Sequence, residues 1–312
     1  MKIVSLLASA TEIVAVLGLE DRLVGISHEC DYPPHVLDRP RVSRPRFDPA
    51  GLDSAAIDAA VKGAMASYGS VYALDTELLR RLQPDLILTQ AVCDVCAVPT
   101  SLAEEAARAL GRPITVLSLD AHGISGIMDS IRQVAAATGV ESRGEEVVAR
   151  LGERMEQVRR AVKGAVRPRV LALEWMDPPY VPGHWVPEMI ELAGGKCLAG
   201  EPGRRSREVS WDRLADMDPD VVVVMPCGYG LEDARGAANR YADRLTAIAP
   251  RAVAAGQCFV VDGSSYFNRS GPRVAEGVEI LGALFHPDRV RGVTLDGRAE
   301  RWSPSLTLAE GG

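Results

Sequence analysis

Short apolar runs of strand length recur along this chain and alternate with helix-patterned segments. They lie at Ile3–Leu7, Leu23–Ser27, Leu86–Thr89 and Ile114–Leu117, and then at Val170–Leu173, Val221–Met225 and Phe259–Val261. Nearly continuous Val, Ile and Leu is typical of strands in a parallel sheet that helices cover on both faces. The sequence therefore predicts an α/β fold.

An internal similarity indicates two related lobes. The segment LRRLQPDLIL at 79–88 is similar to LADMDPDVVV at 214–223. Each segment combines the end of a helix, a Pro-Asp pair that stops it and a buried strand. The length of 312 residues also exceeds what one hydrophobic core usually supports.

The helix-patterned segment 123–139 separates the two series of strands. A helix of this length would span roughly 25 Å, and we interpret it as a rigid connection between the lobes. An ordinary crossover helix is the alternative. The expected division is an N-terminal α/β lobe at 1–122, the linking helix at 123–139, a C-terminal α/β lobe at 140–288 and a C-terminal extension at 289–312.

Charge and apolar content exclude several classes of protein. Thirty-five Lys and Arg against 42 Asp and Glu give a net charge of −7, which disfavours nucleic acid as a partner. No uncharged apolar run reaches the roughly 18 residues that cross a bilayer, so membrane insertion is not expected.

No signal peptide follows Met1, which predicts a cytoplasmic location, or a periplasmic or other extracytoplasmic one if a leader has been removed. Common catalytic motifs are also missing, which favours a non-catalytic protein.

Aromatic and polar side chains are concentrated in the loops after the predicted strands. Ligands of open parallel sheets bind beyond the carboxyl ends of the strands, so these loops form the candidate site. Only 5% of the residues are aromatic, and their concentration here favours a site for a large, flat small-molecule ligand, although some rings could instead cap the core. The candidate ligand-binding residues are Ser9, Tyr32, Trp175, Tyr180, His184, Trp185, Tyr266, Phe267, Asn268 and Arg269.

A second candidate site combines His28, Cys30, Cys93 and Cys96, which follow two strands expected to be neighbours. One imidazole and three thiolates form a tetrahedral set that suits zinc or a similar soft metal. Alternatively, Cys93 and Cys96 form a redox pair, or His28 or His184 ligates the cobalt of a corrinoid. The remaining alternative is that the thiols are simply buried.

Several loop sequences carry a resemblance to a known family. They are Ser5–Glu12, Asp31–Pro34, Pro178–Gly183, Leu192–Gly195 and Tyr266–Arg273. In this order they resemble the cobalamin-binding solute receptors of bacterial ABC importers, from about Lys2 to Pro287. The resemblance implies the helical-backbone periplasmic-binding-protein fold, in which two Rossmann-like lobes with parallel sheets are joined by a single long helix. It also implies non-catalytic binding of cobalamin, a related corrinoid or a similar large metal chelate in the cleft between the lobes.

The resemblance also implies a partner. In the family, one carboxylate on each lobe docks on the transporter, and Glu77 and Asp212 match these positions. The implied partner is the permease of an ABC importer, if this protein is exported. Ordinary exposed carboxylates are the alternative.

The sequence departs from the family at two places. An insertion at 39–74 replaces the segment that carries a cleft tryptophan, and Tyr68 or Tyr72 is the candidate replacement. The histidine and cysteine pairs have no counterpart in the transport receptor and resemble a leaderless cytoplasmic branch. The leading hypothesis is therefore corrinoid binding, and the alternative is a thiolate metal-binding or redox protein on the same scaffold.

Overall fold

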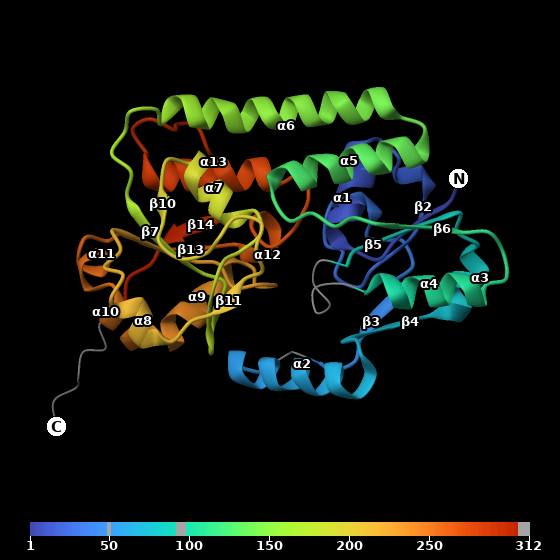
Figure 1. Cartoon of the computed structure of the whole chain (residues 1–312), viewed down its shortest axis with the longest axis horizontal. Coiled ribbons are helices and arrows are strands. Elements are labelled where there is room, and N and C mark those ends of the chain that lie inside the picture. The colour runs from blue at the N-terminus through green and yellow to red at the C-terminus, as the bar shows by residue number, and fades with distance from the viewer. Residues whose placement is uncertain (49–50, 92–97, 305–312) are drawn as a thin grey trace. The chain divides into compact units, whose positions relative to one another are not determined.

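The computed structural model describes residues 1–48, 51–91 and 98–304 (Figure 1). Its described residues form two compact units. The first comprises Met1–Leu151 with Ser270–Pro272, and the second comprises Gly152–Arg269 with the residues from Arg273 onward. The expected helix at 123–139 is present as α5 (Ile124–Thr138), but it lies in the first unit. The chain passes to the second unit within the next helix, α6 (Glu141–Ala161).

A four-stranded parallel sheet forms the centre of the first unit, in the order β2-β1-β5-β6. Its strands are β1 (Ile3–Ser5), β2 (Leu23–Ile26), β5 (Leu86–Thr89) and β6 (Thr115–Ser118). β1 and β5 are buried along their whole length, whereas the edge strand β6 is partly exposed. The almost uninterrupted apolar character of the inner strands follows from helices covering both faces.

Helices α1 (Ala8–Val16) and α5 pack together on one face of this sheet, and α3 (Thr76–Leu82) and α4 (Thr100–Ala109) cover the other (Figure 1). Asp75 caps α3 by accepting a 2.8 Å hydrogen bond from the backbone N–H of Leu78.

The 39–74 insertion forms helix α2 (Ser54–Tyr68) and the antiparallel ribbon of β3 (Ser43–Pro45) and β4 (Tyr72–Leu74). Short 3-10 turns lie at η1 (Glu20–Arg22) and η2 (Pro34–Val36).

The second unit contains a five-stranded sheet in the order β10-β7-β12-β13-β14. The strands are β10 (Lys196–Cys197), β7 (Arg169–Leu173), β12 (Val221–Val224), β13 (Cys258–Val261) and β14 (Ala299–Arg301). All the pairings are parallel except that between β13 and β14. A separate three-stranded antiparallel sheet follows β7, and it consists of β8 (Trp175–Met176), β9 (Pro179–Val181) and β11 (Arg207–Glu208).

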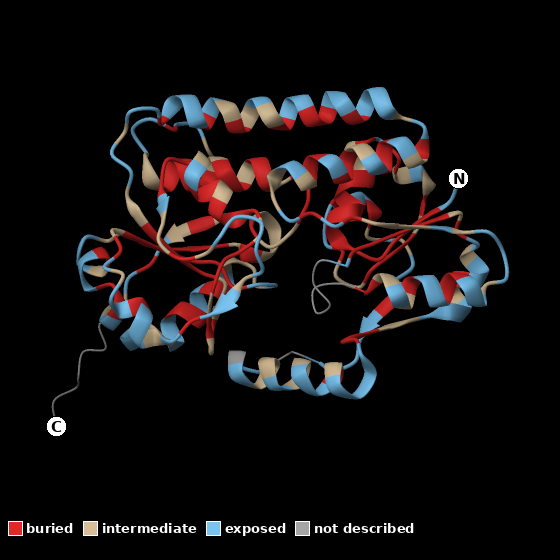
Figure 2. Cartoon of the chain, in the orientation of Figure 1, coloured by how far each residue is buried: buried red, intermediate tan, exposed pale blue. Residues whose placement is uncertain are grey.

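Helices cover both faces of the five-stranded sheet (Figures 1 and 2). One face carries α8 (Trp211–Ala215), α9 (Leu231–Arg240), α10 (Ala242–Ile248) and α11 (Pro250–Ala254). The other carries α7 (Val186–Leu192) and α13 (Val274–Phe285), which pack against each other. Helix α12 (Gly263–Tyr266) begins directly after β13, where Asp262 caps it through a 2.8 Å hydrogen bond from the N–H of Ser265. The loops after β7, β12 and β13 therefore share one edge of the unit.

The C-terminal extension adds β14 to this sheet. Trp302 is almost fully buried, and its indole N–H donates a 2.8 Å hydrogen bond to Oδ1 of Asn239. A turn precedes this strand, because the N–H of Arg298 donates a 2.9 Å hydrogen bond to the carbonyl of Leu295. The described part of the extension is thus integral to the second unit.

The 21-residue helix α6 is amphipathic. Val147, Leu151, Met155 and Val158 recur at helical spacing and are buried, while most of the exposed residues of this helix are charged. Across residues 1–48, 51–91 and 98–304, helices that combine the length and the apolar character needed to cross a bilayer are absent.

Candidate functional site

The first unit brings the loops after β1 and β2 together, because these strands are neighbours. Ser9 lies at the start of α1 and is almost fully buried. Oγ of Ser9 lies 3.3 Å from Oγ of Ser270. The Cβ of Ser9 also lies close to the backbone of Gly271, because a Cβ added at Gly271 would be only 3.1 Å from it. The Ser9 hydroxyl therefore binds a neighbouring segment of the same unit and is not presented to solvent.

His28 follows β2 and belongs to a compact polar cluster. Its Nδ1 lies 2.9 Å from Oγ of Ser43, which donates a 3.1 Å hydrogen bond to Oγ of Ser27. The imidazole ring also lies 5.1 Å from the ring of Tyr72, measured between centroids. Burial lowers the pKa of His28 to about 4, with a smaller contribution from the charge of Arg41. The imidazole is therefore neutral at physiological pH.

Arg41 holds the loop that carries His28. Its Nη1 donates hydrogen bonds to the carbonyl oxygens of Ser27 at 2.9 Å, His28 at 3.2 Å and Cys30 at 2.6 Å. Oγ1 of Thr11 lies 3.0 Å from Sγ of Cys30. Together these contacts fix the backbone of the loop and bury Cys30.

Two tyrosines of the insertion have different environments. Tyr72 is buried, and its hydroxyl donates a 2.8 Å hydrogen bond to Oε1 of Glu29. Tyr68 is exposed at the end of α2, with the guanidinium of Arg46 4.6 Å from its ring centroid. Tyr72 thus lies beside His28, whereas Tyr68 does not join this cluster.

The four-ligand metal site remains a prediction. Cys93 and Cys96 lie outside the described residues. Within the described part of the chain, groups of three or more His, Cys, Asp or Glu side chains that could hold a metal ion are absent. Burial raises the pKa of the Cys197 thiol to about 11 and that of Cys258 to about 12, so neither thiol ionises readily. The zinc and redox alternatives gain no support from these residues.

In the second unit, aromatic side chains gather after β7. Trp175 is partly exposed, and its ring meets that of Tyr229 edge-on at 5.4 Å between centroids. Tyr180, also partly exposed, pairs with Trp175 across β8 and β9. Tyr229 follows β12, so the aromatic cluster of Trp175, Tyr180 and Tyr229 draws on two neighbouring strand ends.

Glu174 precedes this cluster directly. Its Oε2 accepts a 2.5 Å hydrogen bond from Oγ of Ser206. Burial raises the pKa of Glu174 to about 7, and the Ser206 bond opposes that shift. A carboxyl group at this edge therefore changes charge near neutral pH.

The loop at 183–185 is tightly constrained. A Cβ at Gly183 would lie 2.2 Å from the carbonyl oxygen of Arg204, so only glycine fits. The N–H of His184 donates a 2.6 Å hydrogen bond to the same oxygen. His184 has a left-handed backbone with φ of 51°, and its ring lies 5.6 Å from that of Trp185 between centroids.

Two of the expected ligand-binding aromatics belong to the core. Trp185 is 8% exposed, and its indole N–H donates a 2.7 Å hydrogen bond to the carbonyl of Phe267. Phe267 itself is fully buried. We expected Phe267 to contact a ligand, but its burial corrects this interpretation. A side chain without exposed surface fills space within the unit. Capping of the core, the alternative considered from the sequence, describes it better.

The loop after β13 presents Tyr266, Asn268 and Arg269. The guanidinium groups of Arg273 and Arg298 lie 5.5 and 5.4 Å from the ring centroid of Tyr266, whose pKa is raised mainly by burial. Oδ1 of Asn268 is buried and has no hydrogen-bond partner among the described residues. Nη2 of Arg269 donates a 3.2 Å hydrogen bond to Oγ of Ser264.

The two predicted docking carboxylates are exposed. Glu77, in the first turn of α3, has 71% of its side chain exposed and pairs with Arg80. Asp212 lies in the first turn of α8. Each is thus accessible on its own unit.

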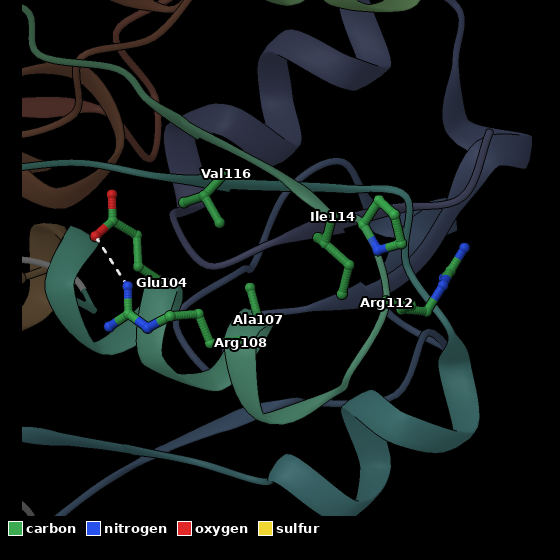
Figure 3. A pocket seen from close by; sticks show the side chains of 7 residues that line it. Glu104, Ala107, Arg108, Arg112, Ile114 and Val116 are labelled. Atoms are coloured by element: carbon green, nitrogen blue, oxygen red, sulfur yellow. Dashed lines mark ion pairs between the residues drawn. The ribbon is translucent and has the colours of Figure 1, made fainter.

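Two surface cavities occur in the first unit. One of about 450 Å³ is lined by Arg41, Ser43, Arg44, Leu74, Asp75, Thr76 and Glu77. The other, of about 380 Å³, lies between α4 and β6, and Figure 3 shows Glu104, Arg108, Ile114 and Val116 among its lining residues. Glu104 and Arg108 pair there at 3.8 Å. Neither lining includes an aromatic side chain, so neither cavity matches the site expected for a flat ligand.

Sequence reasoning missed several residues at these edges. Tyr229 could have been predicted from the sequence, because it follows the predicted strand at Val221–Met225 just as the other candidate ligand-binding residues follow their strands. Ser43 and Arg41 carried no comparable signal, since they reach the edge from an insertion. Their roles depend on tertiary contacts.

Comparisons with known proteins agree with this architecture. The family described as periplasmic binding protein matches residues 3–260. An uncharacterized ABC transporter substrate-binding lipoprotein of Bacillus subtilis is 25% identical over 299 residues, covering 92% of this chain and 80% of that protein. A vitamin B12-binding protein of Vibrio cholerae is 23% identical over 281 residues, covering 89% and 86%. The apo structure of a periplasmic heme-binding protein from Roseiflexus sp. RS-1 is 25% identical with a TM-score of 0.66, covering 92% and 98%.

Proposed function

The chain belongs to the periplasmic binding protein family, and we propose that it binds a large, flat metal chelate of the vitamin B12 or heme type. The expected helical-backbone fold is confirmed by the family match and by the similar solved structures. The expectation of a non-enzymatic protein is confirmed as well, because the relatives are solute-binding proteins. The corrinoid predicted from the sequence is one of two candidate ligands, since one similar protein is named for vitamin B12 and another for heme.

The observation that carries this proposal is the aromatic cluster of Trp175, Tyr180 and Tyr229. These rings lie at the carboxyl edge of a parallel sheet, where ligands of α/β proteins bind. Aromatic rings offer a large apolar area at little cost in rotamer entropy, which suits the face of a macrocycle. Tyr32, 45% exposed after β2, is the corresponding ring in the first unit.

The proposal is tested by titrating the purified protein with cyanocobalamin, cobinamide and hemin, followed by absorbance. At least one of these probes should bind saturably. Roughly 100 Å² of indole contact is worth about 2.5 kcal/mol, which corresponds to about a seventyfold loss of affinity for Trp175→Ala. Trp302→Phe is the matched control, because Trp302 lies beside the amino end of β13 and should leave affinity unchanged.

Absence of saturable binding by all three probes would contradict the proposal. So would equal losses in the two tryptophan variants, because that result would indicate a general loss of stability. A Tyr32→Ala variant tests the first unit in the same titration, and a weakened affinity is expected there too. That one ligand contacts both units stays a prediction from the sequence.

We also propose that Glu77 and Asp212 dock on an ABC permease if the protein is exported. Their exposure supports this role, and family membership supplies the class of partner. The cellular compartment stays a prediction from the sequence. Fractionation of the native host, followed by detection of the protein, tests it directly.

A further inference from the structure

The hydrogen bonds around Ser43 determine which nitrogen of His28 carries the proton. A serine hydroxyl has one proton and two lone pairs. Ser43 donates its proton to Oγ of Ser27 at 3.1 Å and accepts the backbone N–H of His28 at 3.2 Å. Its second lone pair faces Nδ1 of His28, 2.9 Å away, whereas Oγ of Ser27 lies farther from the same nitrogen, at 3.5 Å. We therefore assign the proton to Nδ1, as the donor to Ser43. The lone pair of the imidazole is consequently on Nε2.

Nε2 is not engaged by a described hydrogen bond. Among the described residues, Oε1 of Glu29 lies 3.9 Å from Nε2, which is beyond hydrogen-bond distance, and it already accepts the hydroxyl of Tyr72. The His28 side chain is 21% exposed, so part of it reaches the surface at the end of β2. Nε2 is therefore an uncharged nitrogen whose lone pair can bind a metal ion, and it lies at the edge of the sheet where ligands are expected.

The position of the ring is fixed from three sides. Ser43 orients Nδ1, the Tyr72 ring lies against the imidazole, and Arg41 holds the backbone carbonyls of the loop. Metal-ligating histidines typically have this arrangement, in which one nitrogen donates to a fixed partner and the other, unprotonated nitrogen binds the metal.

We infer that His28 ligates the metal ion of the bound chelate through Nε2, with Ser27, Ser43 and Arg41 as positioning residues. This inference rests on the proposed function. It assigns one residue of the first unit, His28, to the metal. The contact needs neither Cys93 nor Cys96.

Electron paramagnetic resonance with Co(II) cobinamide tests the inference, because this corrinoid has no axial base of its own. An axial ¹⁴N ligand splits the cobalt lines into triplets. The wild-type complex should show these triplets, His28→Ala should lose them, and added imidazole should restore them if the variant is folded. Ser43→Ala should retain the triplets but bind about tenfold more weakly. If hemin is the bound probe, His28→Ala should change the absorbance spectrum of the bound Fe(III), and added imidazole should restore it.

His35→Ala is the control, because His35 is an exposed histidine of the same unit, paired with Glu20. It should change neither spectrum nor affinity. Triplets that persist in His28→Ala, or that disappear in His184→Ala instead, would overturn the inference. A wild-type complex without a nitrogen signal would refute His28 ligation while leaving the proposed function standing. Failure of cobinamide, cyanocobalamin and hemin to bind would refute both.

Discussion

Replacing Glu174 with glutamine is expected to remove a pH dependence from the stability of the protein. Burial raises the pKa of Glu174 from its ordinary 4.5 to about 7 in the folded state. The folded protein therefore binds this proton more tightly than the unfolded chain does. The resulting stabilisation is complete below about pH 4.5 and is lost as the pH rises through about 7.

The size of the effect follows from the shift in pKa. One pKa unit corresponds to about 1.4 kcal/mol, so wild type should lose roughly 2 to 3 kcal/mol between pH 5 and pH 8 through this group. Other groups contribute equally to wild type and to Glu174→Gln, which cannot ionise at this position. The difference between the two proteins therefore isolates the carboxyl group.

Urea unfolding of both proteins at several pH values between 5 and 8 measures this difference. The free energy of unfolding of wild type should fall with pH relative to that of Glu174→Gln. Ser206→Ala should shift the fall to higher pH, because the Ser206 hydrogen bond lowers the pKa of Glu174. Parallel pH profiles for wild type and Glu174→Gln, or a relative gain by wild type at pH 8, would refute the reasoning.

Three further substitutions have defined outcomes. Gly183→Ala should destabilise the protein by about 2 kcal/mol or more in thermal and urea unfolding, because a Cβ would overlap backbone atoms; an unchanged midpoint would contradict this. Trp185→Phe should cost about 1 to 3 kcal/mol by leaving the carbonyl of Phe267 without its 2.7 Å donor, and unaltered stability would count against that hydrogen bond. In an exported context, Glu77→Lys with Asp212→Lys should abolish ligand uptake while affinity in solution is unchanged; normal uptake would exclude docking through these carboxylates.

The sheets were largely predictable from the sequence, because inner strands buried on both faces must be apolar throughout. The run Leu86–Thr89 coincides with β5, for example, and Ile114–Leu117 differs from β6 by one residue. Strands of two or three residues, such as β8 and β11, show no detectable period. The segments 123–139 and 142–163 both have helical patterns, and the pattern does not show which of them carries the chain between units.

The candidate site was less predictable, because a residue's place in a loop does not determine its burial. Trp185 and Phe267 follow strands as Trp175 does, yet the hydrogen bond between them places both in the core. Ser43 orients His28 from 15 residues away, through a ribbon that belongs to an insertion. Contacts of this kind arise from the fold and leave no local pattern.

The strand β14 has a practical consequence for work with shortened versions of this chain. Its residues pair with Phe259, Val260 and Val261, so they occupy one flank of β13. In a protein truncated after Pro287, the backbone N–H and C=O groups on this side of β13 would be unpaired. An exposed strand edge of this kind can pair with a strand of another molecule. Such a fragment would be prone to self-association even with every ligand-contacting residue intact. The final turn and strand thus cover one flank of the central sheet, although they lie beyond the family match.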